Sequence, residues 1–212
     1  MPIWLVGNHI GTQNSRARGD GRSVASAAMA IEPDTKDWTW VLDRACPECG
    51  LDARTVPLDR IGQMVRDNAA EWQRILTTRS ADELATRPSD DRWSAVEYAC
   101  HVRDVLRLYD QRLALMLTED DPDFANWDQD DAAVAERYGE QDPVEVAAAI
   151  GEAAAPLADR FETVEGDAWQ RTGNRSDGAS FTVETFGRYF IHDPVHHLDD
   201  VARGFAVLAD RG

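Results

Sequence analysis

The stretch that decides the fold is residues 93–101, which read WSAVEYACH. Ser94 can accept a hydrogen bond at the start of a helix, and Glu97 follows three residues later, so the two form a capping box. Behind this start, apolar side chains recur at helical spacing to about residue 117. They are Tyr98, Val102, Val105, Tyr109, Leu113 and Met116. We therefore predict a long amphipathic helix here, with His101 in its core-facing stripe.

Three further segments show the same helical spacing of apolar residues. The first follows Pro57 and ends at about residue 77, the second covers about 142–164, and the third covers about 182–208. Two connections are long, and the first of them, residues 118–141, is strongly acidic. No segment alternates with the period of two that indicates a strand. We predict an all-α fold, a four-helix bundle with two long crossover connections.

The composition excludes several classes of function. The chain has 212 residues, of which 43% are hydrophobic, and a net charge of −17 at pH 7. The negative charge repels phosphate backbones, which argues against a nucleic-acid partner. No apolar run approaches the ~20 residues of a membrane span, so we expect no membrane association. Three cysteines are an odd number, which argues against a disulfide scaffold and predicts a reducing, cytoplasmic compartment.

The part of the chain before the bundle divides into two segments. Residues 1–28 place a short apolar piece before a basic stretch, the reverse of a secretory signal, and we expect a disordered tail. If Met29 is the natural start, this tail is not native. Residues 29–56 form an extension that carries Cys46 and Cys49, ahead of the bundle at 57–212. This Cys-x-x-Cys pair is open to three interpretations: a spectator pair, a redox or disulfide pair, or part of a second metal site.

Histidines supply the strongest chemical signal. His192 and His196 are four residues apart, so their side chains lie one turn apart on one helix face and can offer two nitrogens to one metal. A regular helix turns this pair away from the apolar stripe, and we expect a change of register at Pro194 to turn it inward. In the core, His101 needs a hydrogen bond or a metal. Considered alone, the His192–His196 pair is also compatible with a position on the helix surface. His101 alone is also compatible with a core histidine that forms a hydrogen bond.

Several motifs, in this order and spacing, resemble the DinB/YfiT-like superfamily. They are residues 93–104, 169–173, 181–183 and 191–201. In that family a W-S-x-x-E-x-x-x-H pattern opens the second helix, and an H-x-x-x-H pair on the last helix completes a metal site. The resemblance covers roughly residues 57–208 and implies a four-helix bundle that holds one divalent metal, zinc or nickel, through three residues. His101, His192 and His196 occupy those positions.

The resemblance also implies an activity. The family includes mycothiol-dependent maleylpyruvate isomerases and bacillithiol transferases. The isomerases have a second, C-terminal domain that this chain lacks after Gly212, so isomerase activity is not carried over. We expect a metal-dependent thiol S-transferase whose partners are a small thiol and a small electrophilic acceptor. A homodimer is also compatible with this expectation. The alternative is a non-enzymatic bundle that binds a partner or a structural metal.

Three histidines without a fourth protein ligand favour the enzyme, because the open position takes water or substrate. Carboxylates should then orient the ligand histidines. Glu97, Asp104 and Asp200 each lie one turn from a predicted ligand, and the sequence does not rank them. For the acceptor, we expect a place near Trp169 and the long connections.

Overall fold

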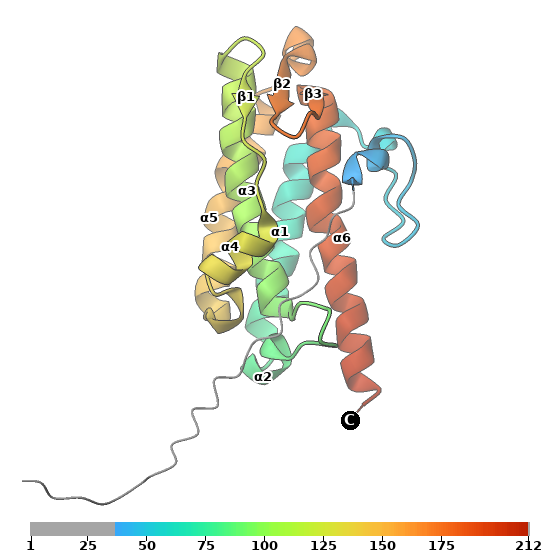
Figure 1. Cartoon of the computed structure of the whole chain (residues 1–212), viewed down its shortest axis with the longest axis vertical. Helices are drawn as coiled ribbons and strands as arrows, with labels where there is room; N and C mark the ends of the chain where they lie inside the picture. Colours follow the sequence, from blue (N-terminus) through green and yellow to red (C-terminus); the bar gives the residue numbers. More distant parts are fainter. Residues whose placement is uncertain (1–36, 212) are drawn as a thin grey trace, which may run out of the picture. The chain divides into compact units, whose positions relative to one another are not determined.

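A computed structural model describes residues 37–211, and the predicted tail at 1–28 lies outside them. The α-helices of this part are α1 (Ile61–Thr78), α2 (Ala81–Ala85), α3 (Ala95–Thr118), α4 (Gln129–Ala135), α5 (Pro143–Glu162) and α6 (Val183–Ala209). The strands are β1 (Asp123–Phe124), β2 (Thr172–Arg175) and β3 (Ser180–Thr182). Short 3₁₀ helices are η1 (Trp38–Leu42), η2 (Ala53–Thr55), η3 (Leu58–Arg60), η4 (Tyr138–Glu140) and η5 (Gly166–Gln170). The four helices predicted from apolar spacing correspond to α1, α3, α5 and α6 (Figure 1).

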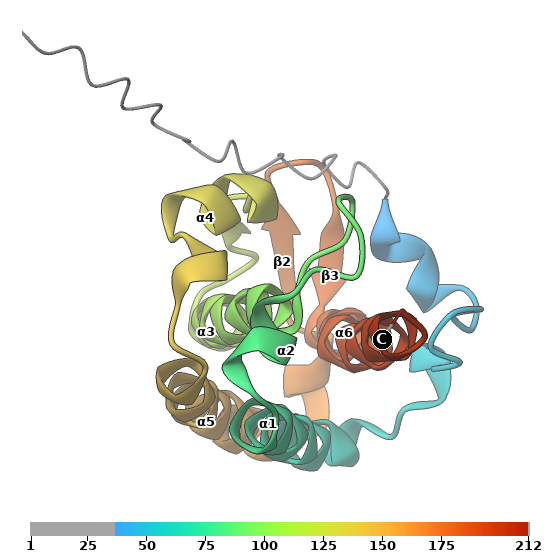
Figure 2. The ribbon, with the colours of Figure 1, turned by 90° about the horizontal axis from the view of Figure 1, so that it is seen from below.

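These four helices form the predicted bundle. α1 packs against α5 and α6, and α3 packs against the same two helices. Viewed from below, the helices follow the order α1, α5, α3, α6 around the bundle (Figure 2). Long connections precede α5 and α6; the first contains β1, α4 and η4, and the second contains η5, β2 and β3. Within residues 37–211, no helix has the length and apolar character needed to cross a membrane.

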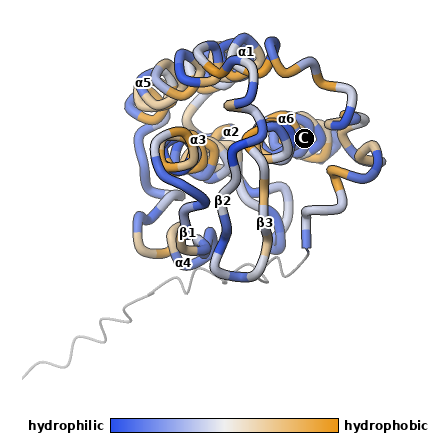
Figure 3. The backbone as a smooth tube through the Cα atoms, turned by 90° about the horizontal axis from the view of Figure 1, so that it is seen from above, coloured by the Kyte–Doolittle hydropathy of each residue, from blue (hydrophilic) through white to orange (hydrophobic). Residues whose placement is uncertain are grey.

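The core lies between the four long helices. Each of them alternates hydrophobic and hydrophilic stretches along its length, as expected for amphipathic helices (Figure 3). Large side chains that are almost fully buried include Trp72, Leu106, Leu113, Ile150, Phe161, Phe186 and Phe190. Burial of each such side chain stabilises the fold by roughly 1.5–3 kcal/mol. This core fixes how α3 and α6 face each other, and the candidate site lies between these two helices.

Local sequence signals explain where the site helices begin and how they continue. The predicted capping box is present at the start of α3: the Glu97 backbone N–H donates to Ser94 Oγ at 3.4 Å, and the Ser94 N–H donates to the Glu97 carboxylate at 2.8 Å. α6 continues as one α-helix across Pro194, so the change of register expected there is absent. Asn68 of α1 donates to the Pro194 carbonyl at 2.8 Å and holds α6 at this level.

A small sheet was not predicted from the sequence. β1 pairs parallel to β2, and β2 pairs antiparallel to β3, with Gly173 opposite Phe181. Each strand has only two to four residues, too few to show a period of two. The sheet ties the connection that leaves α3 to the one that enters α6, and Trp127 follows directly after this tie.

Candidate metal centre

α6 carries two pairs of potential metal ligands, offset by one residue. Each pair is spaced four residues apart and lies one turn apart on one face. Successive residues of a helix point about 100° apart, so the two pairs face different neighbours. Asp193 and His197 face α3, whereas His192 and His196 face the segment that precedes α1.

The three histidines of the predicted site therefore fall into two groups. The α3–α6 cluster consists of His101, Asp193 and His197. The cysteine–histidine cluster consists of Cys46, Cys49, His192 and His196. In each group the potential ligand atoms lie within 4.8 Å of one another. Among the residues that the structure describes, His101 does not share a group with His192 and His196, because α6 keeps a regular register across Pro194.

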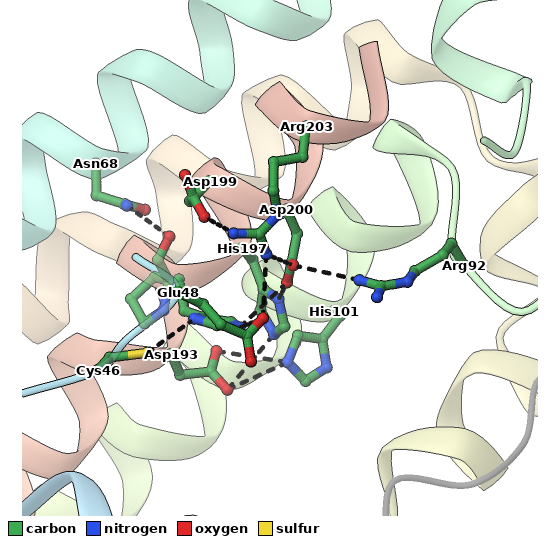
Figure 4. Close-up of polar contacts among 12 residues, drawn as sticks. Cys46, Glu48, Asn68, Arg92, His101, Asp193, His197, Asp199, Asp200 and Arg203 are labelled. Atoms are coloured by element: carbon green, nitrogen blue, oxygen red, sulfur yellow. Dashed lines mark hydrogen bonds and ion pairs between the residues drawn. The ribbon is translucent and has the colours of Figure 1, made fainter. Parts of the chain in front are cut away.

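Asp193 is the centre of the α3–α6 cluster. Its carboxylate oxygens lie 3.4 and 3.5 Å from His101 Nε2, and Oδ2 lies 3.7 Å from His197 Nε2 (Figure 4). Burial opposes ionisation of this carboxyl, but the neighbouring His101 and His197 outweigh it and hold its pKa at about 2. Asp193 therefore brings a negative charge to the cluster at neutral pH.

Asp200 fixes the orientation of His197. His197 Nδ1 lies 3.0 Å from Asp200 Oδ2, and a carboxylate can only accept, so Nδ1 carries the proton. In the neutral ring, Nε2 is then the nitrogen with a lone pair, and it points at Asp193. A carboxylate behind a histidine in this way is the usual arrangement for a metal ligand. Of the three carboxylates named from the sequence, Asp200 is the one that contacts a histidine of either cluster.

The other two carboxylates have structural roles. Glu97 completes the capping box of α3 and pairs with Arg87, whose Nε lies 2.9 Å from it. Asp104 accepts from the hydroxyl of Tyr138 at 2.7 Å and from Arg103 at 2.8 Å. Both side chains are thus bound to partners away from the α3–α6 cluster.

A divalent metal fits the α3–α6 cluster. At metal–ligand distances of about 2.0–2.1 Å, tetrahedral geometry puts nitrogen and oxygen ligands about 3.4 Å apart, close to the distances from Asp193 to both histidines. Asp193 Oδ1 is buried and lies 3.4 Å from His101 Nε2 without forming a hydrogen bond to it, and a cation between the two atoms would satisfy both. Two histidines and a carboxylate form a ligand set that leaves a position open for substrate.

Aromatic rings and a cavity surround this cluster. His101 stacks on Trp127 of the α3–α5 connection, with ring centroids 5.6 Å apart, and the Trp93 ring lies 5.4 Å from the His101 ring in a tilted orientation. A cavity of about 330 Å³ opens beside Asp193 and His197, a volume within the range of small-molecule sites. Its wall also includes His192 and His196 of α6, together with Trp38, Glu48, Arg92, Tyr98 and Asp130. Trp169, expected near the acceptor, stacks on Phe161 instead and is not part of this wall.

The cysteine–histidine cluster lies on the neighbouring face of α6, because His192 and His196 each precede Asp193 and His197 by one residue. Cys46 Sγ is 3.6 Å from His196 Nδ1. Burial lowers the pKa of His192 to about 4, with a further contribution from His196. Burial also raises the pKa of the Cys49 thiol to about 11. Without a bound cation, this cluster is therefore neutral at pH 7 with respect to these two groups.

Asp193 and His197 were not among the ligands predicted from the sequence, although the sequence contains a signal for their position. The apolar stripe of α6 runs from Phe190 to Val201, and helical steps of three and four residues between them land on positions 193 and 197. The polar residues that interrupt the stripe are therefore the ones that face α3.

Comparisons with known proteins agree with this fold. The family model of the DinB superfamily matches residues 64–201. A solved structure, YfiT from Bacillus subtilis, is similar with a TM-score of 0.65 and 20% sequence identity over 72% of this chain and 87% of that one. YfiT is described as a probable metal-dependent hydrolase with an unusual four-helix bundle topology. Comparison with curated protein sequences gives no match. The family match covers more than half of the chain, and the chain therefore belongs to the DinB superfamily.

Proposed function

We propose that this protein is a metal-dependent enzyme that transfers a low-molecular-weight thiol, of the mycothiol type, to a small electrophilic acceptor. The observation that carries the proposal is the α3–α6 cluster, in which His101, Asp193 and His197 converge beside a cavity of about 330 Å³. A structural metal would need no such cavity, because structural sites are closed by four protein ligands. Zinc is the first choice of metal and nickel the second.

Each residue of the α3–α6 cluster has a separate role in the proposed reaction. A divalent metal held by them would lower the pKa of the thiol that fills its open position. His101 and His197 supply neutral nitrogens, and Asp193 supplies one negative charge, which leaves the loaded site with a net positive charge. Asp200 keeps the proton of His197 on Nδ1 and so keeps Nε2 available. Trp127 and Trp93 cover His101 and exclude water from that side.

The cavity wall sets where an acceptor would lie. Arg92 is the basic residue among those that line it, and its guanidinium lies 3.8 Å from Asp200. Trp38 and Tyr98 add aromatic surface beside it. A small acceptor with an apolar body suits this aromatic surface, whereas the five carboxylates in the same wall disfavour an anionic group. Ionisation of the thiol accounts for only part of the rate acceleration. Positioning the thiol and the acceptor next to each other in the cavity would supply the rest.

Hydrolysis is the second candidate, with water in place of the thiol. Two observations favour it: YfiT is described as a probable metal-dependent hydrolase, and two histidines with a carboxylate form the zinc ligand set of known hydrolases. The odd number of cysteines favours a reducing compartment, and we place either activity in the cytoplasm.

Cobalt substitution tests the proposal. The Cys46→Ser/Cys49→Ser variant is loaded with Co²⁺ and titrated with mycothiol, so that any thiolate-to-cobalt charge-transfer band in the near ultraviolet comes from the added thiol. We expect such a band, and we expect it to be lost in that variant when His101→Ala is added. If saturating thiol produces no band while cobalt stays bound, thiol transfer is excluded and hydrolysis takes its place. If His101→Ala, Asp193→Ala and His197→Ala each retain all of their metal, the assignment of the cluster is refuted.

A further inference from the structure

We propose that Cys46, Cys49, His192 and His196 bind a second divalent metal ion, zinc by preference, in a closed structural site. These four residues come from two segments nearly 150 residues apart, yet their potential ligand atoms all lie within 4.8 Å of one another. Two thiolates and two imidazoles are a ligand set typical of structural zinc, and soft thiolates disfavour magnesium and calcium. The set shares no residue with the α3–α6 cluster.

The distance between the two segments fits a tetrahedral ion. With zinc–sulfur bonds of about 2.3 Å and zinc–nitrogen bonds of about 2.0–2.1 Å, tetrahedral geometry separates sulfur and nitrogen by about 3.6 Å. Cys46 Sγ and His196 Nδ1 are 3.6 Å apart. Cys46, His192 and His196 are buried, at 2%, 4% and 6% exposure, and Cys49 is half-buried, so most of the ligand set is shielded from solvent.

The loop between the cysteines is shaped to present both sulfurs. The Cys46 N–H donates to the Leu51 carbonyl at 2.9 Å, and the Gly50 N–H donates to the Cys46 carbonyl at 3.0 Å. Gly50 has a φ of +76°, a conformation that favours glycine. The chain therefore reverses directly after Cys49, and the two cysteines of the Cys-x-x-Cys motif end on the side that faces α6.

Both histidines are arranged as ligands. His196 turns Nδ1 to Cys46, while its Nε2 lies 3.6 Å from Asp200 and 4.0 Å from Glu48, two carboxylates that can hold the ring. His192 Nε2 is buried and has no hydrogen-bond partner in the part of the chain that the structure describes. A buried nitrogen of this kind needs a partner, and a metal ion held by the adjacent thiols would supply one.

The ion would fasten the extension to the bundle. The segment at residues 38–51 also meets α6 through ring contacts of Trp38 with His192 at 5.7 Å and with His196 at 5.3 Å, and through the ion pair of Glu48 with Arg203 at 3.4 Å. Trp38 and Glu48 also line the cavity beside the α3–α6 cluster. Binding at the four ligands would therefore fix one wall of that cavity and add to the stability of the fold.

The test measures metal content and the cobalt spectrum of the full chain. Loaded with Co²⁺ and no added thiol, the wild-type protein should show thiolate-to-cobalt charge transfer and the intense visible bands of four-coordinate cobalt. Cys46→Ser/Cys49→Ser should abolish the charge-transfer band and lower the zinc content by one equivalent per chain. His101→Ala, which removes a ligand of the other cluster, should keep both. Cys100→Ser is the matched control, because that buried thiol faces the Tyr138 carbonyl and belongs to neither cluster.

Two results would overturn the proposal. One is a wild-type protein that binds cobalt without any thiolate charge transfer, a measurement that does not depend on how a variant folds. The other is a Cys46–Cys49 disulfide, detected by mass spectrometry of the unreduced protein. Neither result bears on the α3–α6 cluster, whose ligands contain no sulfur.

Discussion

Replacing Asp200 with Asn should weaken metal binding at the α3–α6 cluster by roughly 10–100-fold, which corresponds to about 1.4–2.7 kcal/mol. The carboxylate accepts from His197 Nδ1 at 3.0 Å, and its side chain is only 7% exposed, so water screens the interaction little. An amide can present its NH₂ group to Nδ1 instead. The ring proton then moves to Nε2, the atom that faces Asp193, and this nitrogen no longer has a lone pair for a metal.

The assay is competition for Zn²⁺ against a chromophoric chelator, at fixed pH and salt. It uses the Cys46→Ser/Cys49→Ser background, so that one cluster is observed. Asp199→Asn is the matched control: Asp199 is the adjacent carboxylate and also pairs with Arg203, but it contacts no histidine. An equal loss of affinity in both variants, or no loss with Asp200→Asn, would refute the reasoning that Asp200 acts by orienting His197.

Two further predictions concern stability. Gly187→Ala should lower the free energy of unfolding by about 1–3 kcal/mol in urea denaturation, because the new Cβ would lie 2.9 Å from Ile61 Cδ1 and 3.0 Å from a Phe161 ring carbon. Gly204→Ala is the control: its closest contact is at 3.4 Å, so the free energy of unfolding should instead rise by roughly 0.5–1 kcal/mol from helix propensity. Similar effects at both sites would contradict the packing around Gly187. Glu97→Gln should destabilise the protein at pH 7, and this destabilisation should shrink as the pH falls below 4.5. Burial raises the pKa of Glu97, but hydrogen bonds from Arg87 and Ser94 outweigh burial and hold the pKa below its usual 4.5. The contribution of Glu97 to stability is therefore complete above that pH and is lost as the pH falls through the folded-state pKa. Thermal melts of both proteins across this range check it, and a destabilisation that does not change with pH would contradict the ion pair.

The sequence predicted the bundle because its signals are local. The spacing of apolar side chains located the four long helices to within a few residues, and the capping box of Ser94 and Glu97 marked the start of α3. Periodicity failed for β1–β3, whose few residues are ordered by pairing with distant segments.

The site was predicted only in part, since its geometry depends on which face of α6 meets which neighbour. His101 was placed correctly in the core, but His192 and His196 were chosen as its partners from their four-residue spacing and the family resemblance, which do not tell which face of α6 meets α3. Asp193 and His197 could be found from the apolar stripe. The meeting of Cys46 with His196 could not, because no local pattern relates residues 150 positions apart.

The one-residue offset between the two pairs on α6 has an evolutionary consequence. Insertion of a single residue into the first turns of α6 would rotate everything after it by about 100°. His192 and His196 would then move into the places of Asp193 and His197, opposite His101. One codon thus separates this arrangement from a three-histidine centre, and the same insertion would carry both histidines away from Cys46 and Cys49. An insertion of this kind therefore acts on both clusters at once, whereas a substitution at one of these four positions changes the ligands of a single cluster.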